Sequence, residues 1–398
     1  MRIAIISDLV GFSWAGCEEL WAALARKALK EGRKVAFFQI RETISPDKIQ
    51  PLQELGLELI LPGMGTRLVD RVRRHVSWKL GSIAAPWFPA FVGLQKFAPD
   101  VIFVNGGEAI PSPEFLHDLT RSHALMFPYV LACHNSYLFR KPLGGKAREI
   151  AVRYYQGARR VLFVAQRTRN DTEHLLATNL ASVTVVRNPV NMTDTRPLPM
   201  PSGSTVRIAS VGRLSINAKG QDILLAALGS PKFKDRDWQL SIYGDGPHLA
   251  HLKLLADHYQ ISERVAFKGH APDVRAIWAD NHLLALPSRN ESAPLVLVEA
   301  MLCGRPSVAT DVGGIREWVN EPETGFISEG INVESFQSAL ERAWSAQLDW
   351  ESIGQRARAK ALQMLDPDPG GTVLNILLEV AAQRRSGIQT ELRESNHA

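Results

Sequence analysis

The sequence predicts an α/β protein made of two doubly wound domains, each with a parallel sheet between layers of helices. Three observations support this prediction. Both halves of the chain alternate short β-branched runs with helical stretches, a pattern typical of parallel sheets. A proline-rich segment separates the halves. The length of 398 residues exceeds one typical domain but suits two that each bury a core.

The first domain is expected over residues 1–190. Its strands are predicted where apolar and β-branched residues cluster in runs too short for helices. These runs are 2–7, 34–40, 57–61, 100–105, 126–132, 160–165 and 183–187.

A linker is expected at residues 191–205, which read NMTDTRPLPMPSGST, because three prolines, a glycine and no apolar periodicity are typical of a connecting segment. The second domain is expected over residues 206–366. Ligands of open α/β sheets bind beyond the carboxyl ends of the strands, so we expect site residues on the loops that follow them. The predicted strands are 206–211, 239–243, 265–267, 282–286, 307–309 and 325–327.

Composition argues against several classes of protein. The longest apolar stretch, 82–94, contains two prolines and is shorter than the roughly 20 residues of a membrane-spanning helix. The first residues begin a strand rather than a secretory signal. The three cysteines, Cys17, Cys133 and Cys303, have no metal-ligand spacing, so we expect a reduced, cytoplasmic setting and no metal site.

The net charge of +5 is unevenly distributed. Residues 1–200 hold 26 Lys and Arg against 17 Asp and Glu, whereas residues 201–398 hold 20 against 24. Opposite signs suggest two domains with different partners. A basic half can face an anionic membrane, an acidic acceptor or solvent, and charge does not choose among these.

One segment, 287–314, carries the most specific pattern, PSRNESAPLVLVEAMLCGRPSVATDVGG. Glu291 and Glu299 stand eight apart around a small-residue turn and an apolar run. A carboxylate accepts hydrogen bonds from neighbouring hydroxyls, so two of them can hold two polyols, such as a sugar and a ribose. Glu299 lies in an apolar helical stretch, where an ionised group is costly without a partner.

This segment resembles the signature of retaining glycosyltransferases of family 4. The paired glutamates are followed by the turn Gly304, Arg305 and Pro306 and by the pair Gly313 and Gly314, as in that family. The resemblance implies the GT-B fold, in which two Rossmann-like domains face a central cleft. It also implies that a C-terminal helix, here 370–385, packs back on the first domain. The polar residues 386–398 are expected to form a mobile tail.

The loop VGRLSINAKG, 211–220, follows a predicted strand and precedes a helix. Arg213 can bind two oxygens of a diphosphate with its planar fork, and Lys219 adds a compact positive charge. The alternative is a pair of surface cations. In the resembling family these positions hold the donor diphosphate and stabilise the leaving group, a role that suits preorganised cations.

The resemblance assigns further residues. It implies that Glu291 faces the transferred sugar and Glu299 holds the ribose hydroxyls. An alternative role for Glu291 as a covalent nucleophile is less favoured. The remaining expected donor-binding residues are Gly16 in the turn WAGCE, Gly244 and Gly246 in YGDGP, Lys268 after the next strand, and Ser292, Ala293 and Leu295 at the signature helix.

His134 follows a predicted strand of the first domain. A single histidine is more often structural than catalytic. The resembling family carries His followed by Asp or Asn at this place, near the donor sugar. The resemblance therefore implies that His134 is a catalytic residue together with Glu291, Arg213 and Lys219.

A basic stretch gives an indication of where the acceptor is found. Arg67, Arg71, Arg74 and Trp78 recur on one helical face. Such a face can bind anionic lipid headgroups, and the alternative is a solvated basic helix that packs through its aliphatic side.

Taken with the resemblance, the sequence predicts an enzyme that moves a sugar from a UDP- or GDP-linked donor to an acceptor hydroxyl with retention of configuration, in polysaccharide or glycolipid synthesis. Its acceptor is expected to be a saccharide or lipid-linked molecule. No cofactor, metal or nucleic acid is expected. The location is cytoplasmic, including the inner membrane face. Two alternatives remain open: a non-catalytic sugar-nucleotide-binding protein, which needs neither Glu291 nor Lys219, and a GT-B epimerase.

Overall fold

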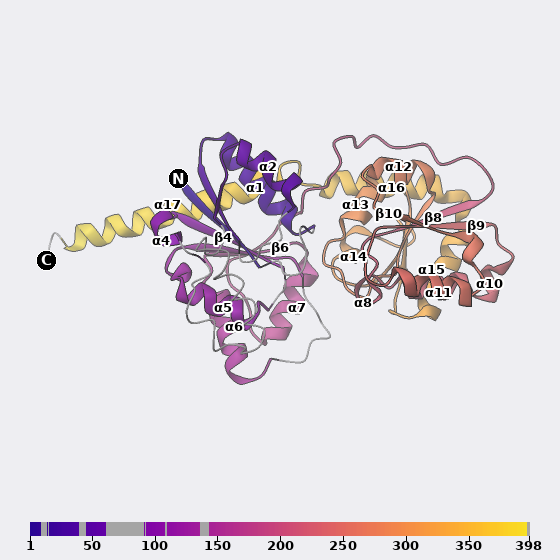
Figure 1. The fold of residues 1–398 in the computed structure, drawn as a ribbon, viewed down its shortest axis with the longest axis horizontal. Helices are drawn as coiled ribbons and strands as arrows, with labels where there is room; N and C mark the ends of the chain where they lie inside the picture. The colour runs from indigo at the N-terminus through magenta and orange to yellow at the C-terminus, as the bar shows by residue number, and fades with distance from the viewer. Residues whose placement is uncertain are drawn as a thin grey trace, which may run out of the picture. The chain divides into compact units, whose positions relative to one another are not determined.

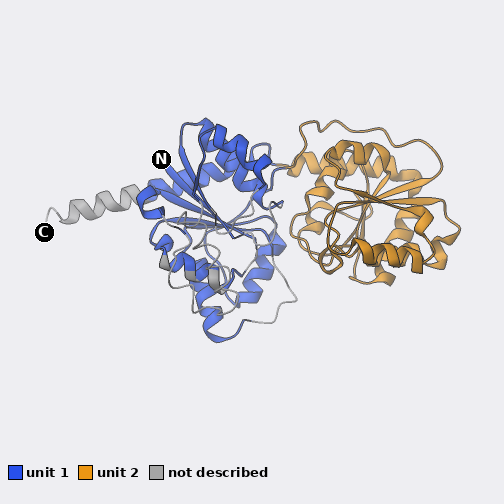
Figure 2. Cartoon of the chain, in the orientation of Figure 1, with its two compact units in different colours: residues 1–189, 366–398 blue, residues 190–365 orange. Residues whose placement is uncertain are grey.

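The computed structural model describes residues 1–8, 14, 16–39, 45–60, 91, 93–107, 110–135 and 143–395. These residues form two compact units, which Figure 2 colours separately. The first unit contains Met1–Pro189 and Asp366–Ala398, and the second contains Val190–Leu365.

A parallel sheet forms the centre of the first unit, with the strand order β3-β2-β1-β4-β5-β6-β7. Each of its strands overlaps one of the predicted runs. In β1, Ile3, Ile5 and Ile6 have no exposed surface, as expected for a sheet covered by helices on both faces. The strands are β1 (Arg2–Ser7), β2 (Lys34–Gln39), β3 (Glu58–Ile60), β4 (Val101–Gly106), β5 (Tyr129–Cys133), β6 (Arg160–Phe163) and β7 (Val183–Val185).

The fifth strand begins later than the sequence predicts. A 3₁₀ turn occupies Ala124–Met126, where the strand was expected to start. Pro128 pairs with the sheet only through its carbonyl, which accepts from Ile102 N at 2.9 Å, because proline has no N–H to donate. The regular strand therefore starts at Tyr129.

Helices cover both faces of this sheet (Figure 1). Local sequence sets some of their starts: Ser112 Oγ accepts from Phe115 N at 3.1 Å, which caps the helix that follows it. The helices between the strands are α1 (Glu18–Lys30), α2 (Pro46–Glu54), α4 (Leu94–Phe97), α5 (Pro113–Arg121), α6 (Gly145–Gly157) and α7 (Gln166–Leu176).

The last helix, α17 (Pro369–Ser395), returns the chain to the first unit and packs along α1 (Figure 1). A Cβ on Gly370 would lie 2.5 Å from the carbonyl oxygen of Ala23, so this glycine allows the two helices to approach closely. Val373 and Leu374 of α17 are buried in the same core as the inner face of α1.

This helix is longer than the sequence analysis expects. The expected helix spans 370–385, whereas the helical backbone continues to Ser395, through most of the segment expected to be a tail. The added residues, 386–395, read SGIQTELRES. No proline interrupts them, and Gln, Glu, Leu and Arg have good helix propensity, so the helix continues.

The second unit has its own parallel sheet, with the order β10-β9-β8-β11-β12-β13. Its six strands also coincide with the predicted runs. The order reverses between β8 and β11, which makes the edge between these two strands the switch point of the sheet. The strands are β8 (Val206–Val211), β9 (Trp238–Tyr243), β10 (Val265–Gly269), β11 (Leu283–Leu286), β12 (Ser307–Thr310) and β13 (Phe326–Ser328).

Helices flank this sheet as well (Figure 1). Asp273 caps one of them by accepting from Arg275 N at 2.9 Å, and Asn332 caps another by accepting from Ser335 N at 2.8 Å. The helices are α8 (Ile216–Lys219), α9 (Gln221–Leu228), α10 (Pro231–Lys234), α11 (Leu249–His258), α12 (Val274–Asp280), α13 (Leu295–Leu302), α14 (Ile315–Trp318), α15 (Val333–Ser345) and α16 (Trp350–Met364).

The segment expected to be a linker, 191–205, is attached to the second unit by side chains that bind its backbone carbonyls. Arg305, which has no exposed surface, donates from Nη1 to Leu198 O at 3.1 Å and from Nη2 to Pro199 O at 2.6 Å. Further bonds come from Arg275 to Asp194 O and Arg196 O, from Arg358 to Thr195 O, from His282 to Pro201 O and from Arg207 to Ser202 O. Arg305 of the signature turn therefore fixes this segment.

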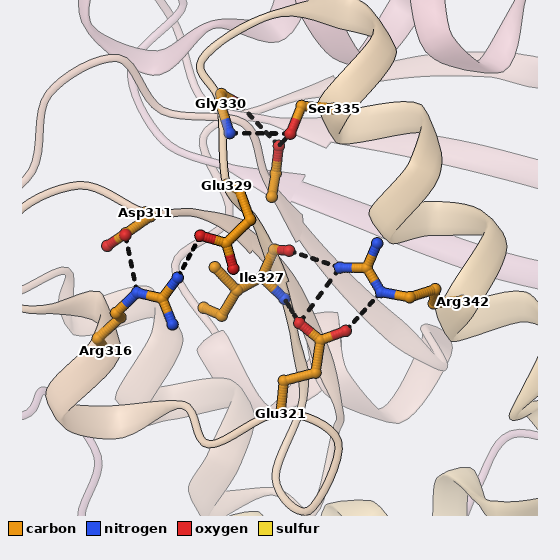
Figure 3. A network of polar contacts seen from close by, with 9 residues as sticks. Asp311, Arg316, Glu321, Ile327, Glu329, Gly330, Ser335 and Arg342 are labelled. Atoms are coloured by element: carbon orange, nitrogen blue, oxygen red, sulfur yellow. Dashed lines mark hydrogen bonds and ion pairs between the residues drawn. The ribbon is translucent and has the colours of Figure 1, made fainter.

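A network of ion pairs holds the edge strand β13 (Figure 3). Arg316 bridges Asp311 and Glu329, with N–O distances of 2.7 and 2.5 Å. Arg342 pairs with Glu321 at 2.6 Å and donates to Ile327 O at 2.7 Å. These contacts connect the turn after β12 to the helices α14 and α15.

Across the described residues, no helix combines the length and the apolar character that crossing a bilayer requires.

Candidate functional site

The predicted donor-side residues of the second unit gather where its strands end. The loop 212–215 follows β8, and the loop 287–294 follows β11. Because β8 and β11 are neighbours, both loops leave the sheet at the switch point. This is where doubly wound sheets bind ligands.

Lys219 and Glu291 form an ion pair, although 72 residues separate them in the sequence. Lys219 Nζ lies 2.5 Å from Glu291 Oε1, and Ser288 Oγ donates to the same oxygen at 2.9 Å. The Glu291 side chain is 8% exposed and that of Lys219 is 27% exposed. The carboxylate is thus fixed by two donors, and the lysine side chain is more exposed than the carboxylate that it binds.

A second ion pair attaches the loop 287–294 to the helices α8 and α9. Arg289 binds Asp222 in a bidentate manner, at 2.6 and 2.7 Å, and also donates to Ile216 O at 2.7 Å. The backbone N–H groups of Arg289 and Asn290 both donate to Ala218 O, at 2.8 and 3.0 Å. Short α8, which ends at Lys219, is therefore held against the loop that carries Glu291.

Two glycines permit this contact. Gly220 has φ +63°, and a Cβ there would lie 2.0 Å from Pro287 O. Gly313 has φ +52°, and a Cβ there would lie 1.9 Å from Glu291 O. At both positions a side chain would meet backbone, so only glycine fits without displacing the loop.

Glu299 lies on α13 and is 8% exposed. Burial raises its pKa to about 7. Among the described residues its carboxylate forms no hydrogen bond or ion pair. A buried carboxylate in this state is costly, and its free acceptor oxygens suit a ligand that brings hydroxyl donors.

The residues between the two glutamates have different surroundings. Ser292 is buried, and its carbonyl accepts from Gly314 N at 2.7 Å, which attaches the Gly-Gly turn to the start of α13. Ala293 and Leu295 are half-buried. Ser292, Ala293 and Leu295 thus belong to the short segment that connects Glu291 to the helix carrying Glu299.

The glycines after β9 bring a third loop to this place. Gly244 N donates to Gly269 O at 2.7 Å, and Gly212 N donates to Tyr243 O at 3.0 Å. A Cβ on Gly244 would lie 2.2 Å from Gly212 O, and one on Gly246 would lie 2.5 Å from Leu214 O. The loops after β8 and β9 therefore pack backbone against backbone.

Two of the expected cations are exposed to solvent. Arg213 follows β8, and its carbonyl accepts from Gln221 Nε2 at 2.9 Å, which fixes its backbone. Lys268 lies near the end of β10. Both are placed on the same edge of the sheet as Lys219.

The other predicted site residues belong to the first unit. Gly16 is exposed in the turn before α1. His134 follows β5 and is buried. The basic stretch with Arg67, Arg71 and Arg74 lies outside the described residues.

His134 is the end of a buried polar chain. Glu18, at the start of α1, accepts from Ser7 Oγ at 2.8 Å, from Trp21 Nε1 at 2.6 Å and from Asn105 Nδ2 at 3.0 Å. Asn105 Oδ1 lies 2.9 Å from His134 Nε2. The four chain members Ser7, Glu18, Asn105 and His134 are each at most 6% exposed.

Burial dominates the electrostatics of this chain. It raises the pKa of Glu18, and the hydrogen bonds from Trp21, Ser7 and Asn105 oppose that shift by favouring the ionised form. It lowers the pKa of His134 to about 4, so the imidazole is neutral near neutral pH.

Ser7 and Asn105 escaped the sequence analysis. Ser7 is the last residue of β1 and Asn105 the last but one of β4, and the two strands pair with Ser7 opposite Asn105. The sequence did contain a signal for these residues, because each is a polar residue near the end of an otherwise apolar strand. Parallel neighbouring strands bring such residues together at one edge of the sheet. Glu18 entered the sequence analysis only as the last residue of the turn WAGCE.

The described residues contain no group of three or more His, Cys, Asp or Glu arranged to hold a metal ion.

The second unit matches a family of known proteins. Residues 205–346 match the family described as Glycosyl transferases group 1. This range covers both loops at the switch point, from Arg213 to Glu299. The matched domain is therefore the one that carries the Lys219–Glu291 pair.

Two curated relatives are similar over part of the chain. An uncharacterized glycosyltransferase of Haemophilus influenzae is 36% identical over 135 residues, 34% of this chain and 38% of the relative. One component of the human phosphatidylinositol N-acetylglucosaminyltransferase is 31% identical over 185 residues, 46% of this chain and 38% of the relative. The similar segment thus spans well under half the length of either relative.

Solved structures share the whole architecture. HepE of Anabaena, solved with UDP and glucose, superimposes with a TM-score of 0.70 at 17% identity, over 98% of this chain and 100% of that one. The fold is thus that of GT-B glycosyltransferases, with two Rossmann-like parallel sheets.

Proposed function

We propose that this protein is a retaining glycosyltransferase of family 4 that moves a sugar from a nucleotide-diphosphate sugar to an acceptor hydroxyl. The observation that carries the proposal is the Lys219–Glu291 pair at the switch point of the second sheet. The bond that breaks in such a donor joins the anomeric carbon to a phosphate oxygen. A cation that binds the phosphate and a carboxylate that faces the sugar must therefore lie close together. The Lys219 ammonium and the Glu291 carboxylate are 2.5 Å apart.

The residues then have separate tasks. Lys219 and Arg213 bind the diphosphate and meet the charge that develops as it leaves. Glu291 faces the sugar side of the same bond. Glu299, buried and without a described partner, accepts from the ribose hydroxyls. His134 contributes from the first unit as a neutral imidazole.

Retention follows, in this proposal, from departure and attack on the same face of the sugar. Glu291 is less suited to be a covalent nucleophile, because its Oε1 is already bound by both Lys219 and Ser288. Lys219 and Arg213 supply the positive charge that the diphosphate requires, and we propose that the reaction is independent of metal ions. Turnover that persists in a chelator such as EDTA would support this, and turnover restored only by Mg²⁺ or Mn²⁺ would contradict it.

We propose a UDP- or GDP-linked donor and a saccharide or lipid-linked acceptor, in polysaccharide or glycolipid synthesis. Two similar proteins support these classes. HepE was solved with UDP and glucose, and the name of the human relative includes phosphatidylinositol.

The test has two parts. A thermal-shift panel of nucleotide diphosphates and their sugars identifies the donor, since a ligand at 100 times its Kd adds about 2.7 kcal/mol to the free energy of unfolding. Release of nucleoside diphosphate, and the anomeric configuration of the product by ¹H NMR, are then measured with wild type and Glu291→Ala.

We expect Glu291→Ala to bind the nucleotide like wild type and to lose turnover. Binding without turnover in the wild type, across donors and acceptors, would favour the alternative of a sugar-nucleotide-binding protein. A product of inverted configuration would overturn retention. Release of a free, epimerised sugar nucleotide would favour an epimerase.

A further inference from the structure

The buried chain Ser7–Glu18–Asn105–His134 has donor and acceptor properties that can be worked out from its chemistry. Trp21 Nε1–H is a donor only, and it lies 2.6 Å from Glu18 Oε2. Ser7 Oγ and Asn105 Nδ2 both reach Glu18 Oε1. Three donors thus converge on one carboxylate, which is the environment that an ionised, acceptor-only group requires.

An acceptor-only Glu18 fixes the orientation of the next residue. Asn105 must present its NH₂ group to Glu18, so its carbonyl oxygen faces His134. A carbonyl oxygen only accepts, so His134 must carry its proton on Nε2, which lies 2.9 Å away. The other ring nitrogen, Nδ1, is then left unprotonated.

His134 Nδ1 is buried and has no hydrogen-bond partner within the part of the chain that the structure describes. A buried acceptor without a hydrogen bond is destabilising, because it has lost its contacts with water and gained none in return. A group of this kind, held in one protonation state by four buried residues, is prepared for a hydrogen-bond donor that arrives with a ligand.

We propose that Glu18 and Asn105 are positioning residues that hold His134 in the Nε2–H tautomer, so that Nδ1 accepts a hydrogen bond from a hydroxyl group of the bound saccharide. This inference rests on the proposed function for the nature of the ligand. The tautomer itself follows from the contacts alone. His134 touches the saccharide, and Glu18 and Asn105 act through it.

These hydrogen bonds also predict the effect of replacing one carboxylate oxygen of Glu18 by an NH₂ group. In Glu18→Gln the carboxamide oxygen must stay on the Trp21 side, because indole N–H cannot accept. The new NH₂ group then faces Asn105, whose amide turns to offer its oxygen to Gln and its NH₂ to His134. Nε2 becomes the acceptor, and the proton moves to Nδ1.

The double variant Glu18→Gln/Asn105→Asp reverses this. The carboxylate at position 105 accepts from the NH₂ group at position 18 and again from His134 Nε2–H. The wild-type tautomer is therefore restored, with the total charge of the chain unchanged. A purely structural role for these residues predicts no such exchange.

The experiment is long-range ¹H–¹⁵N NMR of the imidazole rings in the full-length protein, which assigns the protonated nitrogen of His134. His134→Gln identifies the signal. The matched control is Glu19→Gln, the same change one residue along, where the carboxylate pairs with Trp14 Nε1 and Lys48 at 2.8 Å each, outside the chain. We expect Nε2–H in the wild type, in Glu19→Gln and in the double variant, and Nδ1–H in Glu18→Gln.

An Nδ1–H tautomer in the wild type would overturn the inference without any variant, so the result does not depend on whether Glu18→Gln folds. An unchanged tautomer in a folded Glu18→Gln would overturn it as well. In the donor assay we expect Glu18→Gln to lower kcat/KM by about 10-fold, with recovery in the double variant. Absence of all transferase activity would instead count against the proposed function, while the NMR result still decides the tautomer.

Discussion

The candidate site in the second unit and the polar chain in the first unit differ in charge and in exposure to solvent. The first of these is a charged pair, Lys219 and Glu291, of which the lysine remains partly exposed. The other is a buried chain in which Glu18 is the acidic residue and His134, whose pKa burial lowers to about 4, is neutral near neutral pH. A diphosphate needs cations that it can reach from solvent, whereas sugar hydroxyls need donors and acceptors held in one state.

The supporting structure differs in the same way. In the second unit, glycines let loops pack backbone against backbone, and the bidentate pair of Arg289 with Asp222 attaches the loop 287–294 to α9. In the first unit, side chains at the ends of β1, β4 and β5 bind one another directly. We therefore expect substitutions at the glycines of the second unit to displace a loop. Substitutions in the polar chain of the first unit should instead change which atom carries a proton.

The largest expected effect is at Lys219. Lys219→Ala removes the cation that we propose binds the diphosphate, and it leaves Glu291 with Ser288 as its remaining described partner. We therefore expect kcat/KM to fall by about 10²–10³-fold. Steady-state kinetics with the donor identified by thermal shift would measure it. The control is Lys232→Ala, which breaks an exposed pair with Glu341 on the surface and should leave kcat/KM unchanged. Equal losses in the two variants would contradict the assignment.

Next is the loop contact at Gly220. Gly220→Ala places a Cβ against Pro287 O at a positive φ, and we expect a loss of about 2–3 kcal/mol in the free energy of unfolding of the second unit. Urea denaturation followed by tryptophan fluorescence measures it. Gly144→Ala, where nothing lies within 4 Å of the new Cβ, is the matched change in the first unit and should cost much less. Comparable losses would show that the contact with Pro287 does not fix the loop.

The pKa of Glu299 gives a pH dependence. Burial raises this pKa to about 7 in the free protein, and hydrogen bonds from ribose hydroxyls favour the ionised form. The bound state therefore has the lower pKa, and affinity must rise as pH rises through the free-state pKa. We expect about a 10-fold gain between about pH 6 and 8 for a nucleotide-sugar, by calorimetry. In Glu299→Gln the same titration should be flat, and a persistent rise there would assign the effect to another group.

The smallest effect is expected at Arg316, which bridges Asp311 and Glu329 beside the Gly-Gly turn (Figure 3). The Arg316 side chain is 47% exposed, so solvent screens the pairs, and Arg316→Ala should cost less than about 1 kcal/mol. A small fall in the unfolding midpoint with kcat/KM retained would agree. A loss of activity as large as in Lys219→Ala would mean that the ion pairs of Arg316 fix the position of the Gly-Gly turn.

The strand pattern shows how much of the fold the sequence contains. Apolar β-branched runs predicted the strands of both sheets, because a strand buried on both faces must be apolar throughout. The extent of α17 was not predicted, since its last turns are polar and carry no apolar stripe. The attachment of 191–205 by Arg305 and its neighbours was also missed, because carbonyl acceptors leave no mark in composition.

The sequence singles out candidate site residues one by one, but it does not show how they are arranged. Spacing and resemblance singled out Lys219 and Glu291, yet their direct contact depends on β8 lying next to β11. Asn105 lies 87 residues from Glu18, and their contact depends on β1 pairing with β4. Strand order is a tertiary property, so long-range pairs of this kind become visible only once the sheet is assembled.

The central claim is that Lys219 and Glu291 act on the two sides of one bond, and a double-mutant cycle tests it most directly. The kcat/KM for sugar transfer is measured for wild type, Lys219→Met, Glu291→Gln and the double variant, with nucleotide binding as the check on folding. We predict strong non-additivity, with the double variant no more than about 10-fold worse than the poorer single variant. Losses that multiply fully would show that the two residues act independently, and would contradict the account.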